Sequence, residues 1–375
     1  FGNSRWSSLG GWINAIIPIL IVPYYSVIGG WVIKYLIEYF AGHSKTLAGD
    51  AYFTTFISNG WSTEICFIIF TLFTLSIIYA GVRNGIERVS KFMMPILIVL
   101  SLIIAVYSVT RPGAIEGVKY FLVPNFDHFS WMTVVSAMGQ MFYSLSIAMG
   151  ILITFGSYMK KDTSIEKSTE NVEIFDTAIA IMAGLMIIPA VFAFSGGNAE
   201  TLKSGPALMF ITIPKVFANM GFGTAIGVVF FLLVLFAAVT SSIALTESAV
   251  STFEDELHWS RKKSTVFMGM VMLLLGTLSC LGYGPLANFK ILGMQFLDFF
   301  DFITNSVMMP IAAIATCLLV SKVVGVDKIE EEIKKDGQVF RRKKIFCFMI
   351  KYLCPLFAAI ILISSVANAF GIITM

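Results

Sequence analysis

The sequence predicts an all-α integral membrane protein with about nine transmembrane helices. The first observation is composition: 57% of the residues are hydrophobic, 13% are charged, and the mean hydropathy is +0.84. Soluble domains carry about 25% charged residues. The second is the recurrence of apolar runs of roughly 20 residues, the length that crosses a bilayer as a helix. The third is the placement of lysine and arginine in alternate connections between those runs.

The apolar runs are each predicted to form one span. They lie near residues 12–40, 61–81, 89–110, 131–158, 172–196, 222–254, 264–282, 293–321 and 345–373. Several are longer than a straight crossing needs, which predicts tilted or broken helices. The first run has the length of a full span, so it is not interpreted as a secretory signal.

Lysine and arginine predict the orientation. Of the 26 such residues, 18 fall in one set of alternate connections, which begins with Arg5 and includes 322–344, and 6 fall in the other. Because positive residues remain in the cytoplasm, the first residues are predicted inside and the C-terminus outside the cell membrane. The net charge of +3 follows from this topology and indicates no nucleic-acid partner.

Two of the connections between the spans have predicted structures. The outer segment 199–221 is expected to form a lid-like hairpin or an ordinary ordered loop, and 322–344 a cytoplasmic loop with a short solvated helix. The whole chain, 1–375, is expected to be one transmembrane domain. Its 5 cysteines lie in apolar runs without CxxC spacing, and its 3 histidines are scattered. Neither pattern indicates a disulfide framework or a metal site.

The run "GQMFYSLSIAMGILI" (139–153) has small and hydroxyl-bearing residues at its midpoint, between Ser144 and Gly150. Non-helical backbone survives in a membrane only where it lines a protein cavity. One interpretation is a broken helix whose half-helix ends face a ligand. The other is a continuous helix whose small residues allow close packing with a neighbour.

A second polar cluster lies in "LFAAVTSSIALTESAVSTFEDE" (235–256). Ala237, Thr240 and Ser241 share one face of a helix because they are three and four positions apart. Two hydroxyls and a carbonyl freed by an irregular helix would form an oxygen cluster suited to a hard monovalent cation. The alternative is that the hydroxyls bond back to carbonyls of their own helix.

Carboxylates inside the apolar runs are the third polar feature. Asp176 sits about one turn inside its run, and intramembrane carboxylates are rare and usually functional. Asp298 and Asp301 form another pair, near the outer end of their span. That position also fits an interfacial, partly hydrated pair of carboxylates.

These stretches together resemble the neurotransmitter:sodium symporter family, and in particular its bacterial amino-acid transporters with 11 helices. The resemblance rests on "PYYSVIGGW", "GVRNGIERVSKFMMP", "GQMFYSLSIAMG", "SYMKKD", "TSSIALTE" with "FEDEL", and "FLDFFDF", in family order along the whole chain. It implies the inverted-repeat (5+5) transporter fold with one helix unwound in mid-membrane. The first span resembles helix 3 and the last helix 11, so helices 1 and 2 are expected to precede Phe1.

The resemblance also implies a substrate site. The matching positions are Ile21, Tyr25, Tyr143, Ser144, Ser146, Met149, Ser241 and Leu245. By this comparison, Tyr25 would contact the substrate carboxylate, Tyr143 would cover the substrate, and the unwound backbone at Ser146 would bind it. Ile21, Met149 and Leu245 would line the subsite for the side chain. Ala148 departs from the family pattern, since a glycine is frequent there.

Two sodium sites and two gates are implied in the same way, with helix 1 completing each sodium shell. The first sodium site would use Ser144 and Asp176, and the second Ala237, Thr240 and Ser241. The Asp176 carboxylate would supply the negative charge that chloride provides in other members, so chloride is not expected to be required. The outer gate would use Tyr143 and Asp301, and the inner gate Asp255, Ser157 and Tyr158.

The function implied is sodium-coupled symport of a neutral, hydrophobic amino acid by alternating access. One alternative is an amino-acid carrier of the same fold coupled to another ion. Another is a truncated product that is inactive in transport. An enzyme is not expected, because the sequence contains no HExxH or GxSxG motif. The partners expected are the amino acid and the lipid bilayer, and the oligomeric state stays open.

Overall fold

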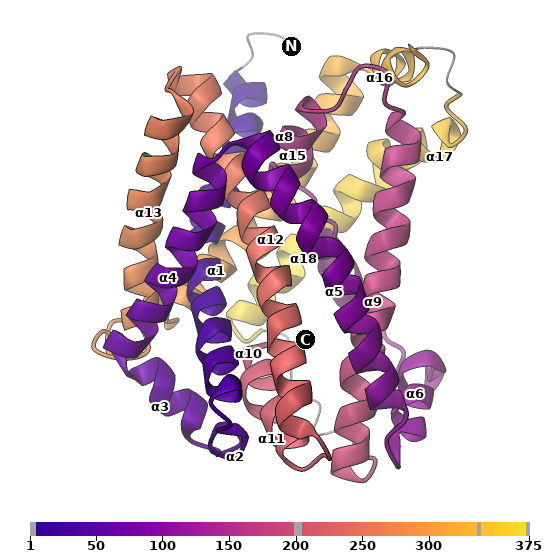
Figure 1. Cartoon of the computed structure of the whole chain (residues 1–375). Coiled ribbons are helices and arrows are strands. Elements are labelled where there is room, and N and C mark those ends of the chain that lie inside the picture. The colour runs from indigo at the N-terminus through magenta and orange to yellow at the C-terminus, as the bar shows by residue number, and fades with distance from the viewer. Residues whose placement is uncertain (1–4, 199–204, 336–338, 373–375) are drawn as a thin grey trace.

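The computed structural model describes residues 5–198, 205–335 and 339–372. Its regular elements there are helices, and the long ones are roughly aligned with one another (Figure 1). Eight helical segments in these ranges are long and apolar enough to cross a membrane. The all-α class predicted from composition is confirmed.

Five spans are formed by single long helices, a sixth by a helix that a π-helical turn precedes, and two are assembled from shorter consecutive pieces. The single helices are α1 (Arg5–Phe40), α4 (Gly60–Tyr79), α9 (Ile165–Ser195), α12 (Gly223–Leu257) and α13 (Arg261–Leu281). A π-helical turn, Val82–Glu87, leads into α5 (Arg88–Val109) to form one further span. The assembled spans contain α14 (Phe296–Asp301) with α15 (Met309–Leu318), and α17 (Lys343–Phe348) with α18 (Cys354–Ala369).

The remaining predicted span, near 131–158, is divided into two half-helices. α7 (Trp131–Ser144) begins with a capping box in which Ser130 and Thr133 satisfy each other's backbone N–H groups. The chain then leaves the helical path, and α8 (Ile151–Ser157) resumes after Gly150. The predicted break is therefore confirmed, and the continuous helix is excluded.

α1 lies at the centre of the bundle. It packs against α12, α4 and α13, and its apolar window is more buried than that of the other spans. Gly30 explains the close approach of α4, because a Cβ atom there would lie 2.6 Å from the Phe67 backbone nitrogen. Side chains on α1 are therefore held by contacts on several sides, which suits a helix that carries site residues.

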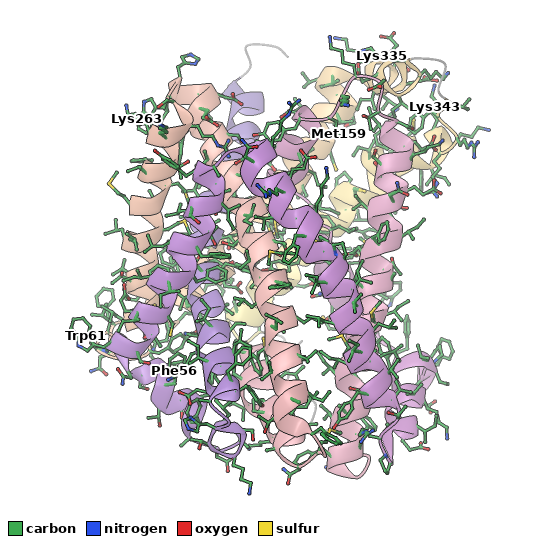
Figure 2. The ribbon with its side chains drawn as sticks, viewed as in Figure 1. Phe56, Trp61, Met159, Lys263, Lys335 and Lys343 are labelled. Atoms are coloured by element: carbon green, nitrogen blue, oxygen red, sulfur yellow. The ribbon has the colours of Figure 1, made fainter. Side chains whose placement is uncertain are left out.

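The connections differ between the two ends of the bundle. α2 (Ser44–Leu47), α3 (Tyr52–Ser58), α6 (Ala114–Leu122), α10 (Gly205–Ala207) and α11 (Ile213–Ala218) lie at one end, and α16 (Val326–Ile333) and α17 at the other (Figure 1). Figure 2 shows Lys263, Lys335 and Lys343 at the end that carries α16, with Phe56 and Trp61 at the opposite end. We call the end with these three lysines the basic end. We call the other end, which carries α2, α3, α6, α10 and α11, the opposite end.

The segment predicted as an outer hairpin is largely helical. Residues 199–204 of the predicted range 199–221 lie outside the described residues, and 205–218 form a continuous apolar helical run. Phe210, Val216 and Phe217 in this run are buried, and the Tyr35 hydroxyl on α1 donates a hydrogen bond to the Phe210 carbonyl at 2.7 Å. The segment is thus packed on the bundle. Its action as a lid stays a prediction.

The loop predicted over 322–344 contains the amphipathic helix α16, and residues 336–338 lie outside the described residues. Arg342 ties the end of this loop to α9. Its guanidinium group pairs with Glu170 at 3.2 Å and with Glu173 at 3.0 Å. These pairs are half exposed, so each contributes about 0–1 kcal/mol.

Candidate functional site

The break between α7 and α8 places Ser144 against Asp176 of α9. The Ser144 hydroxyl donates a hydrogen bond to the Asp176 carboxylate at 2.5 Å, although the residues are 32 positions apart. Hydrogen bonds to ionised acceptors are short and strong. A hydroxyl and a carboxylate oxygen in direct contact are the ligand types that hard cations prefer. These two predicted first-site residues are therefore brought together.

The backbone at the break is held in an unusual conformation. Ser146, Ala148 and Gly150 have φ values of 53°, 61° and 73°. For residues other than glycine this left-handed region costs roughly 1–2 kcal/mol each. Such strain persists where surrounding contacts impose it, and it concentrates at functional sites. Ala148 thus adopts the left-handed conformation that the glycine frequent in the family would adopt without this cost.

Gly150 has a steric role in addition to its conformation. A Cβ atom there would lie 2.8 Å from the Ser248 hydroxyl oxygen on α12 and 3.1 Å from the Asn14 carbonyl oxygen on α1. Glycine therefore lets the start of α8 approach both helices. The close contact with α1 and α12 holds the second half-helix beside the other site residues.

The second predicted sodium site lies on α12, which is continuous through Ala237. The helix irregularity expected at this carbonyl is therefore absent. The Thr240 hydroxyl instead donates to the Phe236 carbonyl at 3.0 Å and to the Ala237 carbonyl at 3.1 Å. This is the back-bonding arrangement considered as the alternative. It uses the hydroxyl proton and leaves the oxygen lone pairs available to a cation.

Tyr25 and Ser241 connect α1 to α12 at the same level. The Tyr25 hydroxyl and the Ser241 side chain lie close enough to interact. Tyr143, at the end of α7, is close enough to interact electrostatically with Tyr25 and with Asp301. The predicted carboxylate-binding tyrosine, the covering tyrosine and a second-site hydroxyl thus converge from three helices.

The predicted apolar subsite residues are in the interior. Ile21, Met149 and Leu245 belong to one hydrophobic core cluster and are each less than 5% exposed. Ser146 is half-buried in the unwound turn. Two surface grooves of about 430 and 420 Å³ lie elsewhere, at the basic end and beside α11. The roles of these four residues in substrate binding stay predictions.

Asp301 belongs to a polar cluster that sequence reasoning missed in part. Its carboxylate accepts hydrogen bonds from the Tyr24 hydroxyl at 3.2 Å and from the Asn305 side-chain amide at 2.6 Å. Asn305 lies one helical turn after Asp301, a spacing that could have indicated it. Asp298 accepts from the Tyr283 hydroxyl at 2.9 Å. Burial beside Asp298 raises the pKa of the Tyr283 hydroxyl, which keeps it protonated as a donor.

At the basic end, Tyr158 joins a buried ion pair that sequence reasoning also missed. The Tyr158 hydroxyl donates to Glu247 at 2.8 Å, and Arg261 donates to the two Glu247 oxygens at 3.0 and 2.5 Å. The Glu247 side chain is 0% exposed. An acid inside the apolar run of α12 and an arginine at the start of the next span were the available signal. We call these three side chains the Glu247 network.

The other two predicted inner-gate residues lie apart from this network. Asp255 is exposed on the last turn of α12, and the Ser157 hydroxyl donates to the Thr154 carbonyl of its own helix at 2.7 Å. No hydrogen bond or ion pair links Asp255 to Ser157 or Tyr158 in the part of the chain that the structure describes. Their joint action as a gate stays a prediction.

A model of the sodium:neurotransmitter symporter family matches residues 53–372. The chain belongs to this family. It is 32% identical to an uncharacterized sodium-dependent transporter, YhdH, of Bacillus subtilis, covering 99% of this chain and 81% of that protein. A sodium-dependent transporter of Haemophilus influenzae is 29% identical, covering 97% of this chain and 80% of the relative.

A solved structure extends the similarity to the fold. The crystal structure of MhsT in complex with L-phenylalanine matches with a TM-score of 0.83 at 32% identity, covering 97% of this symporter chain and 82% of that chain. The symporter is therefore a multi-pass, sodium-dependent membrane transporter, and it is not an enzyme. The family resemblance read from the sequence motifs is confirmed.

Proposed function

We propose that this symporter couples sodium entry to the uptake of a neutral, hydrophobic amino acid by alternating access. The observation that carries the proposal is the convergence of Ser144 with Asp176 at the broken helix. Tyr25 of α1 and Ser241 of α12 lie close to each other, and Tyr25 also lies near Tyr143, the neighbour of Ser144 in sequence. The related MhsT was crystallised with L-phenylalanine, and the buried Ile21, Met149 and Leu245 supply apolar surface without a basic group for an acidic side chain.

Electrostatics would couple the ion to the amino acid. A substrate carboxylate near the middle of a membrane is costly unless a cation meets it. Sodium held by Ser144 and Asp176 would supply that charge, while Tyr25 would donate a hydrogen bond to the carboxylate. Each ligand would then raise the affinity for the other by the same factor, as linkage requires. A second sodium at Ala237, Thr240 and Ser241 would brace α12.

We also propose that the basic end faces the cytoplasm. Lys263, Lys335 and Lys343 all lie at that end of the bundle (Figure 2), and lysine and arginine concentrate on the cytoplasmic side of membrane proteins. α1 begins at this end, and α18 runs away from it (Figure 1). In this orientation the described chain starts inside the cell and ends outside. The Glu247 network would close the cytoplasmic path, and the Asp301 cluster would lie on the outer path.

Uptake into proteoliposomes tests the substrate and the ion together. We expect uptake of phenylalanine or leucine to rise at least about tenfold when an inward sodium gradient replaces a choline gradient. Unlabelled glycine and glutamate should compete poorly, because the subsite offers apolar contacts. Uptake driven equally by a proton gradient in choline would favour coupling to another ion. Competition by glutamate stronger than that by leucine would contradict the proposed subsite.

Chloride dependence is the second prediction at this site. Because the Asp176 carboxylate already lies against Ser144, we expect uptake to be unchanged when gluconate replaces chloride. In Asp176→Asn this fixed charge is lost, so uptake should fall and become stimulated by chloride. Asp162→Asn, in the exposed turn before α9, is the matched control and should behave as the wild type. Strict chloride dependence of the wild type would refute the role given to Asp176.

A further inference from the structure

A groove at the basic end lies away from the site described above. It has a volume of about 430 Å³ and runs along the start of α13. Its lining consists of Trp259, Ser260, Lys262, Lys263, Val266, Phe267 and Met270. We propose that this groove binds an anionic phospholipid of the surrounding bilayer, with the headgroup phosphate at Lys262 and Lys263 and an acyl chain along α13. The inference does not depend on the proposed substrate.

Aromatic rings give the groove a defined wall. Trp259 and Phe267 meet edge to face, with ring centroids 5.3 Å apart and an interplanar angle of 85°. Phe253 packs on Phe267 in the same way at 5.2 Å. Interlocked rings of this kind hold their geometry, and tryptophan favours the headgroup level of a membrane. The groove therefore has a defined shape and lies at the depth of the lipid headgroups.

The charges in the groove lack a protein counter-ion. Lys262 and Lys263 are exposed, and neither has a carboxylate within 4.0 Å among the described residues. Lys263 lies over the Trp259 ring at 3.9 Å, which holds its ammonium group at the groove. The neighbouring Arg261 is already paired with Glu247 and Glu254. A phosphate diester would therefore supply the anion that the two lysines do not find in the protein.

The acidic residues near the groove do not line it. Asp255 and Glu256 are exposed on the last turn of α12, next to the groove in sequence, but neither is among its lining residues. The Glu254 carboxylate pairs with the Arg261 guanidinium group at 3.5 Å. The lining thus carries two positive groups and no carboxylate, which gives it the charge complementarity that an anionic headgroup needs.

The apolar part of the groove continues toward the middle of the membrane. Val266, Met270 and Leu274 are 58%, 57% and 68% exposed and follow one another at intervals of four residues, on one face of α13. Eight residues of helix extend about 12 Å. This face of α13 thus carries the two lysines first and exposed apolar side chains after them. A phospholipid has the same order, with a charged headgroup followed by apolar acyl chains. A soluble anion would leave these apolar side chains unused.

Quenching of Trp259 fluorescence by brominated lipid tests the proposal. The protein is placed in phosphatidylcholine nanodiscs with increasing amounts of phosphatidylglycerol brominated on its acyl chains, or of brominated phosphatidylcholine. Because the chain has 6 tryptophans, the Trp259 signal is taken as the difference between the wild type and Trp259→Phe. We expect half-maximal quenching at an about tenfold lower fraction of phosphatidylglycerol than of phosphatidylcholine.

Charge variants separate a specific site from general attraction. Lys262→Gln with Lys263→Gln should abolish the preference for phosphatidylglycerol. Lys45→Gln with Lys290→Gln removes the same charge from connections outside the groove and should retain it. Equal quenching by the two lipids in the wild type, or equal loss of preference in both double variants, would overturn the proposal. Displacement of the lipid by inorganic phosphate at low millimolar concentration would assign the groove to a soluble anion instead.

Discussion

Replacing Thr240 and Ser241 together by alanine is expected to abolish sodium-dependent substrate binding and leave a folded protein. Both hydroxyls belong to α12, and Ser241 lies close to Tyr25 of α1. An under-coordinated cation in a low-dielectric site costs several kcal/mol, so the apparent sodium affinity should fall by about a hundredfold or more. Sodium titration of radiolabelled substrate binding measures the change, and circular dichroism verifies the fold.

A matched threonine on the same helix serves as the control. The Thr252 hydroxyl also bonds back to its own helix, donating to the Ser248 carbonyl at 2.9 Å, but it lies three turns beyond Thr240. Thr252→Ala should therefore lose a comparable local hydrogen bond, worth about 1 kcal/mol, and keep sodium affinity unchanged. Wild-type sodium affinity in the Thr240 and Ser241 variant would show that these hydroxyls are not ligands.

Replacing Arg261 by methionine is expected to destabilise the protein strongly. Arg261 pairs with the fully buried Glu247 carboxylate and also donates to the Ile78 carbonyl at 3.0 Å. Its removal leaves the buried Glu247 carboxylate without its counter-ion, which costs about 3–5 kcal/mol. We expect a large fall in the melting temperature of the detergent-solubilised protein. Tyr158→Phe removes one hydrogen bond of the network and should cost about 1 kcal/mol.

A variant that lacks both Glu247 and Arg261 distinguishes loss of the counter-ion from simple loss of packing. Glu247→Gln combined with Arg261→Met removes both charges, so much of the lost stability should return. Arg88→Met, at an exposed position at the start of α5, controls for the substitution itself and should leave the melting temperature unchanged. A double variant as unstable as Arg261→Met alone would show that the unpaired carboxylate is not the cause.

Local features of the sequence were enough to predict much of this structure. The apolar runs give eight continuous spans and one divided span, because hydrocarbon forces each crossing segment to satisfy its backbone internally. A break near Ser144–Gly150 is one of two interpretations of the small and hydroxyl-bearing residues at that midpoint and is implied by the family resemblance, and the structure places it there. The residues matched to the first sodium site, Ser144 and Asp176, do meet.

The partners of buried charges were not predictable in this way. Glu247 and Arg261 stand 14 positions apart on two different helices, and nothing in the local pattern states that α13 brings an arginine to that acid. The same holds for Tyr24, which reaches Asp301 across 277 positions. Hydrophobic periodicity reports which face of a helix is buried, but it carries no information about the register between two helices.

The sequence by itself thus determined the membrane class, the spans, the segregation of positive charge and the family to which the transporter belongs. The tertiary structure decided which polar groups share a site: Ser144 with Asp176, Tyr25 with Ser241, and Tyr158 with Glu247 and Arg261. Whether a segment spans the membrane depends on its affinity for lipid, which is the sum of the transfer free energies of its own residues. Polar pairing depends on how packed helices align, and that alignment is set by contacts such as Gly30 against α4 and Gly150 against α1 and α12.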